Sequence, residues 1–430
     1  MAMELDAVVL VDALSRVRIA GLSAEQRAVR VARRVGASRV LVVGDARDEL
    51  IAWRAGRTCP VLIIGAGQLV HTPLVAPLVA AVGAAPAADG LAIAVGADDR
   101  YAGALLATGP TTAQVLAALM RGDDDNAIAA AATARIAHGE IARHAIATPD
   151  EQRAAHRMLY RILIKPQDNA ITRVLYRPVS RPLTRLLVWT PITPNQVSYL
   201  VAALVALGCW LTAHASANLV VAGTAVILGA AYIDCCDGEI ARLKLMSSRF
   251  GAWIDTVVDE LTSVGYMIAL GWHCHLVFGR GYFGDLGFDP WLAAIGAGVV
   301  TYGWSMYCIY YNIIVVVGSA NSQDYAGNID VVPGRQPNSV RLRPAAPAPA
   351  TRELPRWWAA ITTYAPYMVR RDFISWCALV LAVLHATHVL FVGFTIGGIG
   401  TAATVTIDHV KLVRLRRSIV RGGQVLESAS

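Results

Sequence analysis

Four aspartates stand in two pairs within one short stretch, and no other residues of the sequence are better placed to do chemistry: Asp234, Asp237, Asp255 and Asp259. Residues three or four apart share one face of a helix, so each pair would present two carboxylates together. Four carboxylates at the cytoplasmic ends of two apolar helices need compensation for their charge, which divalent cations supply. All-oxygen ligands suit Mg²⁺ or Mn²⁺ rather than zinc. Two such ions can neutralise a pyrophosphate, so we predict a two-ion site for in-line phosphate transfer.

Other residues of the same stretch fit a phosphate site. Gly238 and Gly251 remove side chains where helices or a nucleotide must come close. Arg242 adds a permanent charge and a planar fork for phosphate. Two alternatives stay open: an aspartate such as Asp234 could cap a helix or be solvated at the interface, and the acids could form an ion pathway in a divalent-cation transporter. Acids flanked by apolar residues, such as Asp255, mark functional sites inside membranes, and the transporter leaves the glycines and the arginine unexplained.

The composition indicates a membrane protein. Hydrophobic residues make up 55% of the 430 residues and charged residues only 16%, with a mean hydropathy of +0.48, whereas a soluble protein carries about a quarter charged residues. The net charge of +7 would suit nucleic acid, but it also suits arginines and lysines on cytoplasmic loops. We therefore expect membrane lipids and no nucleic acid as partners. The seven cysteines show no metal-ligand spacing and predict no disulfide framework.

Residues 1–125 alternate between strand and helix patterns, which predicts a soluble α/β domain with a mostly parallel sheet covered on both faces. The expected strands are residues 7–12, 39–43, 61–64, 91–95 and 104–107. Ser23 and Gln26 form a capping-box pattern before a helix at 23–35, and Thr72-Pro73 opens another helix.

Residues 126–192 are expected to be a helical linker that ends in a juxtamembrane amphipathic segment. Two alanine-rich helical stretches are predicted, and the second starts at the cap Thr148 and runs to about Lys165. A series of arginines follows and is interrupted by prolines: Arg173, Arg177, Arg181 and Arg185. The series could bind an anionic acceptor or anchor the segment at the membrane surface.

Six membrane spans are predicted within residues 193–415: 196–213, 219–233, 253–277, 291–317, 373 to about 388, and about 389–407. The basic stretches fall on one side of the membrane if there are six, which places both termini in the cytoplasm. Residues 416–430 would be a basic cytoplasmic tail. The stretch 341–350 is expected to be disordered, and Trp357-Trp358 to lie at the headgroup level.

The spacing D-x2-D-G-x2-A-R-x8-G-x3-D-x3-D, from Asp234 to Asp259, resembles the signature of the CDP-alcohol phosphotransferase (CDP-alcohol phosphatidyltransferase) family at every fixed position. The resemblance covers about residues 165–415. It implies an α-helical membrane domain of six transmembrane helices, a homodimer, and a metal-dependent transfer that releases CMP.

The resemblance also implies residue roles. Asp234, Asp237 and Asp255 look like metal ligands. Asp259, close to the metals, looks like the general base for the acceptor hydroxyl and like a fourth metal residue. The positions similar to the family's nucleotide contacts are Gly238, Ala241, Arg242, Ser248, Gly251, Thr193 and Asn195. Lys244 and Arg249, inside the signature loop, are candidates for binding the acceptor or the diphosphate.

The order of domains resembles a branch of the family that is fused to an N-terminal nucleotidyltransferase-like domain. The sequence segments 236–242 and 370–373 also resemble that branch. Such a domain needs a glycine-rich basic loop after its first strand, but here Ala13–Arg18 contains no glycine. It also needs a metal-binding aspartate after a central strand, where this chain has Gly65-Ala66-Gly67-Gln68. We therefore predict that the N-terminal domain is degenerate and serves as a scaffold, a regulator or a ligand-binding module.

Together these features predict an enzyme of phospholipid or polyol-phosphodiester synthesis. The donor would be CDP-diacylglycerol or a soluble CDP-polyol, and the acceptor a polyol or a polyol phosphate such as inositol phosphate. The alternatives are a divalent-cation transporter that uses the same aspartates and an inactive regulatory membrane protein. CMP release separates the enzyme from the transporter.

Overall fold

The computed structural model describes residues 4–44, 48–84, 89–164, 171–318, 324–336, 338–345 and 371–427. The chain forms two compact units. The first comprises Met1–Asp168, Arg181–Thr193 and Gly238–Ser247, and the second comprises Asn169–Ser180, Pro194–Asp237 and Ser248–Ser430. The chain therefore passes from one unit to the other inside the signature, between Asp237 and Gly238.

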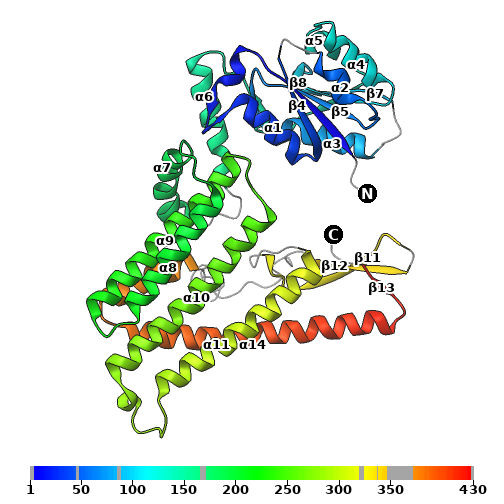
Figure 1. The fold of residues 1–430 in the computed structure, drawn as a ribbon. Coiled ribbons are helices and arrows are strands. Elements are labelled where there is room, and N and C mark those ends of the chain that lie inside the picture. The colour runs from blue at the N-terminus through cyan, green and yellow to red at the C-terminus, as the bar shows by residue number, and fades with distance from the viewer. Residues whose placement is uncertain are drawn as a thin grey trace. The chain divides into compact units, whose positions relative to one another are not determined.

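The first unit contains a six-stranded sheet in the order β4-β1-β5-β8-β7-β9 (Figure 1). In that order the strands are Ala37–Val43, Leu5–Leu10, Val61–Gly65, Tyr101–Thr108, Gly90–Val95 and Ala134–Ala137. β1 runs parallel to β4 and β5, and β7 runs parallel to β9. β8 is antiparallel to both of its neighbours. A tight turn, in which Gly96 N–H donates to the Arg100 carbonyl, joins it to β7.

Helices cover both faces of this sheet, as the α/β pattern predicts. α1 (Ala24–Arg34) and α3 (Thr72–Ala84) contribute Val31 and Leu74 to the core on one face. On the other face the covering helices are α2 (Glu49–Arg54), α4 (Thr111–Met120) and α5 (Asp125–Ala129). The predicted capping box of α1 is present, because Gln26 N–H donates to Ser23 Oγ and Ser23 N–H donates to the Gln26 side chain.

The chain after Asp125 differs from the expected alanine-rich helix. α5 has only five residues, and Ala134–Ala137 then pairs with β7 as the edge strand β9. The sheet therefore continues beyond residue 125, because an exposed edge at β7 is satisfied by backbone pairing that local sequence does not reveal. β10 (Arg143–His144) pairs with β6 (Leu69–Val70), and α6 (Pro149–Tyr160) begins at the predicted cap Thr148.

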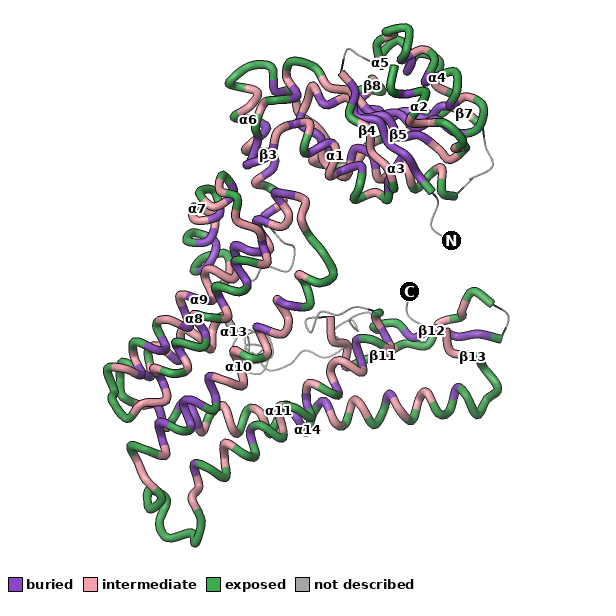
Figure 2. Tube along the Cα trace, viewed as in Figure 1, coloured by how far each residue is buried: buried purple, intermediate pink, exposed green. Residues whose placement is uncertain are grey.

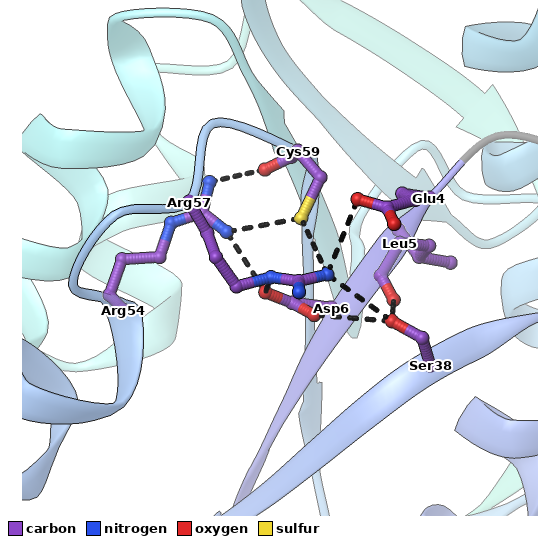
Figure 3. Close-up of polar contacts among 7 residues, drawn as sticks. All are labelled: Glu4, Leu5, Asp6, Ser38, Arg54, Arg57 and Cys59. Carbon is purple, nitrogen blue, oxygen red and sulfur yellow. Dashed lines mark hydrogen bonds and ion pairs between the residues drawn. The ribbon is translucent and has the colours of Figure 1, made fainter.

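Asp6, near the start of β1, has a wholly buried carboxylate. Figure 3 shows two guanidinium groups directed at it. Arg54 Nη1 lies 3.1 Å and Arg57 Nε 2.9 Å from Asp6 Oδ2, and both arginines also contact Cys59 Sγ. A buried charge of this kind is tolerated only when it is paired, so Asp6 fixes the α2–β5 connection to the sheet.

Shorter elements complete the first unit and the segment before the membrane helices. They are η1 (Ala13–Arg16), β2 (Arg18–Ile19), β3 (Leu22–Ser23), η2 (Arg161–Leu163), η3 (Thr172–Tyr176) and α7 (Arg177–Leu187). Residues 165–170, where the linker helix was expected to end, lie outside the described residues.

Long apolar helices make up the second unit: α8 (Pro194–Thr212), α9 (Ala217–Leu243), α10 (Arg249–Phe278), α11 (Pro290–Asn312) and α14 (Thr387–Arg421). In the described part of the chain these five, α11 together with its continuation η5 (Ile313–Val317), are long and apolar enough to cross a membrane. Figure 2 shows large exposed stretches along them, and Trp210, Val300 and Ile407 are exposed apolar side chains. Exposed apolar surface on this scale suits lipid, so this is a multi-pass membrane protein.

The sixth predicted span corresponds to α13 (Arg371–Val383), which is shorter than the others. The count of six stays a prediction. α13 ends in a turn at which His385 has φ +56°, and α14 begins at Thr387. The break between the last two helices therefore lies a few residues before the expected position near residue 388.

Two connections carry small elements. η4 (Arg280–Phe283) lies between α10 and α11. After α11, β11 (Ile329–Pro333) and β12 (Ser339–Pro344) form a hairpin, and β13 (Val425–Leu426) pairs in parallel with β12. Residues 341–344, expected to be disordered, thus belong to a strand. The remainder of that stretch, Trp357-Trp358 and Arg370 lie outside the described residues.

Candidate metal and nucleotide site

Three of the four signature aspartates meet in the second unit. Carboxylate oxygens of Asp234, Asp237 and Asp255 all lie within 4.8 Å of one another. Asp237 is buried, and the other two are partly buried. Two of the carboxylates come from α9 and one from α10, so the site joins the C-terminal part of one helix to the N-terminal part of the next.

The α8 helix contributes a contact that the sequence did not reveal. Ser198 Oγ donates to Asp237 Oδ2 at 2.7 Å, and both side chains are buried. A hydrogen bond to an ionised carboxylate stabilises it and orients its oxygens. Ser198 lies 39 residues from Asp237 in the chain, so no local pattern connects the two.

The donor set fits a divalent cation. Three carboxylates offer oxygen ligands only, which suit hard ions such as Mg²⁺. Three negative charges this close, one of them on a buried residue, would repel one another strongly without a cation. The geometry therefore agrees with the predicted chemistry, although the roles of the individual residues as ligands stay predictions.

Asp259 is not part of this group of three carboxylates. It lies one helical turn beyond Asp255 on α10 and lines a cavity of about 640 Å³, to which Asp234 also contributes. Mostly apolar residues of α8, α9, α10, α11, α13 and α14 form the rest of the lining, with Tyr266 and Tyr302 among the polar exceptions. Asp234 of the carboxylate cluster and the predicted base Asp259 thus border one apolar space.

The next residue, Glu260, ties α10 to α11. Tyr310 Oη donates to Glu260 Oε1 at 3.1 Å, and Tyr302 Oη donates to Glu260 Oε2. These bonds fix the rotation of α10 at the turn that carries Asp259. The tyrosine-rich part of α11 therefore has a positioning contact beside the predicted base.

Three predicted nucleotide residues of this unit lie together at the start of α10. Ser248 is its N-cap and accepts a hydrogen bond from Gly251 N–H at 2.9 Å. A Cβ at Gly251 would lie 3.0 Å from Asn195 Oδ1 and 3.1 Å from Ser248 Oγ. A larger residue here would therefore press against Asn195, which comes from the first turn of α8.

The other predicted nucleotide residues belong to the first unit: Thr193, Gly238, Ala241 and Arg242. Arg242 folds back along α9 toward Gly238, where a Cβ would lie 3.3 Å from Arg242 Nη1. Gly238 thus leaves room for the guanidinium, as a phosphate-binding arginine would require.

The two predicted acceptor-binding residues differ in their surroundings. Arg249 is exposed at the first position of α10. Lys244 is buried, and its ammonium donates to the carbonyls of Thr190 at 2.6 Å and Ile192 at 3.0 Å. The arginine series also differs: Arg177 is buried, whereas Arg185 is exposed and lies over the ring of Tyr160.

The α/β domain has a polar cavity of about 330 Å³ at the carboxyl ends of β1 and β5. Its charged lining is Asp12, Asp124, Asp125 and Arg143. Asp12 caps η1 by accepting from the N–H groups of Leu14 and Ser15. Burial and a hydrogen bond with Asp124 raise the pKa of Asp125 to about 6. The place of a triphosphate-binding basic loop is therefore taken by a capped turn among carboxylates.

Comparison with known proteins finds similarity in the membrane part. Residues 191–335 match the family model for CDP-alcohol phosphatidyltransferase. Two proteins named bifunctional IPC transferase and DIPP synthase are similar to the chain: that of Aquifex aeolicus is 31% identical over 163 residues, 37% of this chain and 35% of the relative, and that of Rubrobacter xylanophilus is 36% identical over 137 residues, 31% of each.

A phosphatidylinositol phosphate synthase from Corynebacterium glutamicum is 31% identical over 94 residues, 22% of this chain and 42% of that protein. The chain spans about a third of the length of the two bifunctional relatives that it matches.

Proposed function

We propose that this membrane protein transfers a substituted phosphate from a CDP-linked alcohol to an inositol phosphate and releases CMP. The match of residues 191–335 to the CDP-alcohol phosphatidyltransferase family supports this proposal. The cluster of Asp234, Asp237 and Asp255 within the signature is the observation that carries the proposal. The acceptor is supported by the Corynebacterium relative, which is named for the synthesis of phosphatidylinositol phosphate.

Asp234, Asp237 and Asp255 would hold two Mg²⁺ or Mn²⁺ ions. When bound, the cations neutralise the diphosphate and stabilise the CMP leaving group. Ser198 orients the carboxylate of Asp237 through its hydrogen bond. Arg242, Gly238, Ala241, Thr193, Asn195, Ser248 and Gly251 are proposed to hold the CDP moiety, with the arginine binding phosphate through its planar fork.

The acceptor hydroxyl oxygen attacks the phosphorus that bears the alcohol, and the bond from that phosphorus to the CMP oxygen breaks. The hydroxyl is a weak nucleophile at neutral pH, so a base must take its proton. Asp259 is proposed as that base because it lies one turn from Asp255 and borders the same cavity as Asp234. Arg249, exposed at the start of α10, is proposed to bind the acceptor's phosphate.

The cavity favours a lipid-linked donor such as CDP-diacylglycerol over a soluble CDP-polyol. Its volume of about 640 Å³ and its mostly apolar lining suit acyl chains. A soluble polyol would leave this apolar surface without a partner. Membrane lipids are thus both the surroundings and the proposed substrate.

We also infer a homodimer, from the family resemblance, and a multi-pass orientation in the cell membrane with both termini in the cytoplasm, from the basic loops. The α/β domain is proposed to have lost nucleotidyl transfer, supported by the three carboxylates that line its cavity beside Arg143 among the described residues.

The test is CMP release by the purified full chain in lipid. Inositol phosphate is offered with CDP-diacylglycerol or with CDP-inositol, at saturating Mg²⁺ or Mn²⁺. We expect metal-dependent CMP release with CDP-diacylglycerol, lost on chelation. Asp237→Asn should reduce the rate about a hundredfold or more, because an amide binds a hard cation poorly at nearly unchanged volume.

Asp285→Asn is the matched control, because Asp285 is an exposed aspartate in the connection between α10 and α11. It should retain wild-type rates. A wild-type chain that releases no CMP with either donor but moves divalent ions across vesicles would replace the transferase with the transporter. A preference for CDP-inositol would overturn the lipid donor alone.

A further inference from the structure

The end of the signature helix is packed into the α/β domain, within the first unit. Leu243, the last residue of α9, is wholly buried in one apolar cluster together with Ile19, Leu69 and Val188. Leu245 packs against a second cluster, the core between the sheet, α1 and α3. Two side chains at the end of α9 and just beyond it thus contact two separate apolar clusters of the first unit.

The backbone of this loop is held in an unusual conformation. Leu245 has φ +54°, a region that residues other than glycine rarely adopt. Met246 N–H donates to the Ala241 carbonyl and Leu245 N–H to the Arg242 carbonyl, which is the pattern of a helix end that normally takes glycine. The side chain of Leu245 packs against the core of the α/β domain. Glycine would fit the backbone angle but could not make this contact.

Arg30 of α1 adds a polar contact to the same loop. Its Nη1 donates to the carbonyl oxygen of Lys244 at 2.6 Å. Lys244 in turn holds the segment before α8, because its ammonium donates to the carbonyls of Thr190 and Ile192. A chain of hydrogen bonds therefore runs from α1 through Lys244 to the residues next to Thr193.

A glycine contact reinforces this arrangement. A Cβ at Gly21 would lie 2.0 Å from the Val188 carbonyl oxygen, so β2–β3 approaches the end of α7 as closely as backbone allows. The α/β domain thus contacts two segments, 186–192 and 243–246. These segments lie next to the predicted nucleotide residues Thr193 and Arg242.

We propose that the α/β domain is a positioning clamp for the nucleotide site: Arg30 and Leu245 fix the signature loop, and Lys244 passes that constraint to the segment before Thr193. Lys244 is then a positioning residue rather than a phosphate ligand. The clamp gives a role to a domain whose own cavity does not suit a triphosphate. The inference rests on the proposed function for its kinetic readout, whereas its structural readout is independent of activity.

The experiment compares Arg30→Ala with Arg33→Ala in the full chain. Arg33 is an exposed arginine of the same helix. Arg30→Ala should raise the KM for CDP-diacylglycerol about tenfold with little change in kcat, because a charge-assisted hydrogen bond that positions the loop is lost. Arg30→Lys, which keeps one donor, should recover part of the loss. Arg33→Ala should behave as the wild type.

Hydrogen exchange supplies the readout that does not need turnover. In Arg30→Ala the amides of 186–192 and 243–246 should exchange at least about tenfold faster, whereas those of Val61–Gly65 in the central strand should not change. Leu245→Gly is a second variant: glycine accepts the backbone angle but removes the side chain that fills the core, so it should loosen the same two segments.

Wild-type exchange in both variants would overturn the clamp, and so would a KM change without faster exchange in these segments. If the wild type releases no CMP, the proposed function fails, and the exchange comparison still decides whether the clamp exists.

Discussion

The signature carboxylates divide into two kinds by their surroundings. Asp234, Asp237 and Asp255 have carboxylate oxygens close together, whereas Asp259 lies one helical turn beyond Asp255 and lines the apolar cavity together with Asp234. A carboxylate among cations is a weak base, and the proposed role of Asp259 therefore requires close alignment with the attacking hydroxyl. The two kinds should respond differently to the same substitution.

Asp259→Asn should lower single-turnover CMP release by about 10²–10⁴-fold, the usual contribution of a general base, while the affinity for the CDP donor stays close to that of the wild type. Asp255→Asn is the matched variant from the same helix and should lose donor affinity and turnover together. Both quantities are measured on the same preparations. Joint loss in Asp259→Asn would make Asp259 a fourth metal ligand, and no loss would remove it from the mechanism.

The residues of the site were predictable to different degrees. The sequence reveals the aspartates, Gly251 and Arg242 because each lies three or four residues from another residue of the signature, which is the spacing of neighbours on one helix face. Ser198 was missed because its partner lies 39 residues away. Lys244 was predicted as a phosphate ligand because a lysine in such a loop carries that charge, but the carbonyls of Thr190 and Ile192, which accept from its ammonium, are visible only in the fold.

At the scale of elements, the first turn of α10 contains its N-cap and a glycine that lies against the neighbouring helix α8. Ser248 caps the helix through Gly251 N–H, and Asn195 of α8 lies against the glycine. This corner therefore sets the distance between the two helices that are proposed to hold the nucleotide.

Gly251→Ala should raise the KM for the CDP donor about threefold or more, because the added methyl displaces Asn195 or Ser248 by a few tenths of an ångström. Gly296→Ala in α11 is the control, since a Cβ there meets nothing within 4 Å. Both changes favour a helix by about 0.5–1 kcal/mol, so stability cannot explain a difference in KM between them. Equal kinetics in the two variants would exclude the close approach as a determinant of donor binding.

The elements themselves were predictable where their signals are local. The capping boxes at Ser23 and Thr148 are present because each involves residues only three apart. β9 was missed because a strand of Ala134–Ala137 depends on pairing with β7, which is distant in sequence. The predicted break between α13 and α14 lay a few residues too late in the chain. The turn depends on the positive φ of His385, and histidine is not a residue type that predicts a turn.

At the scale of the whole chain, the passage between units inside the signature is the feature that composition could not predict. The sequence divides cleanly into a soluble part and an apolar part. Contacts instead assign Gly238–Ser247 to the unit of the α/β domain, because Leu243 and Leu245 have apolar partners there. The signature therefore contains residues of both units.

The number of spans is the remaining whole-chain question, and the small sheet bears on it. β12 follows α11 in the chain, and β13 follows α14, yet the two strands pair through Ser339–Val340 and Val425–Leu426. The end of α11 and the end of α14 therefore lie on the same side of the membrane. An even number of crossings must separate them, so the six-span prediction requires α13 to cross the membrane as α14 does.

We therefore expect the C-terminus and the N-terminal domain on the cytoplasmic side. A fluorescent protein fused after residue 430 should fluoresce, and alkaline phosphatase inserted at Gly284, in the connection between α10 and α11, should be active outside the cytoplasm. The difficulty is α13, whose 13 residues rise only about 20 Å against a hydrocarbon core of about 30 Å. If α13 were a surface helix, five spans would carry the C-terminus outward, and phosphatase fused there would be active. That result would contradict the pairing of β12 with β13 as well as the six-span prediction, because both require the same side.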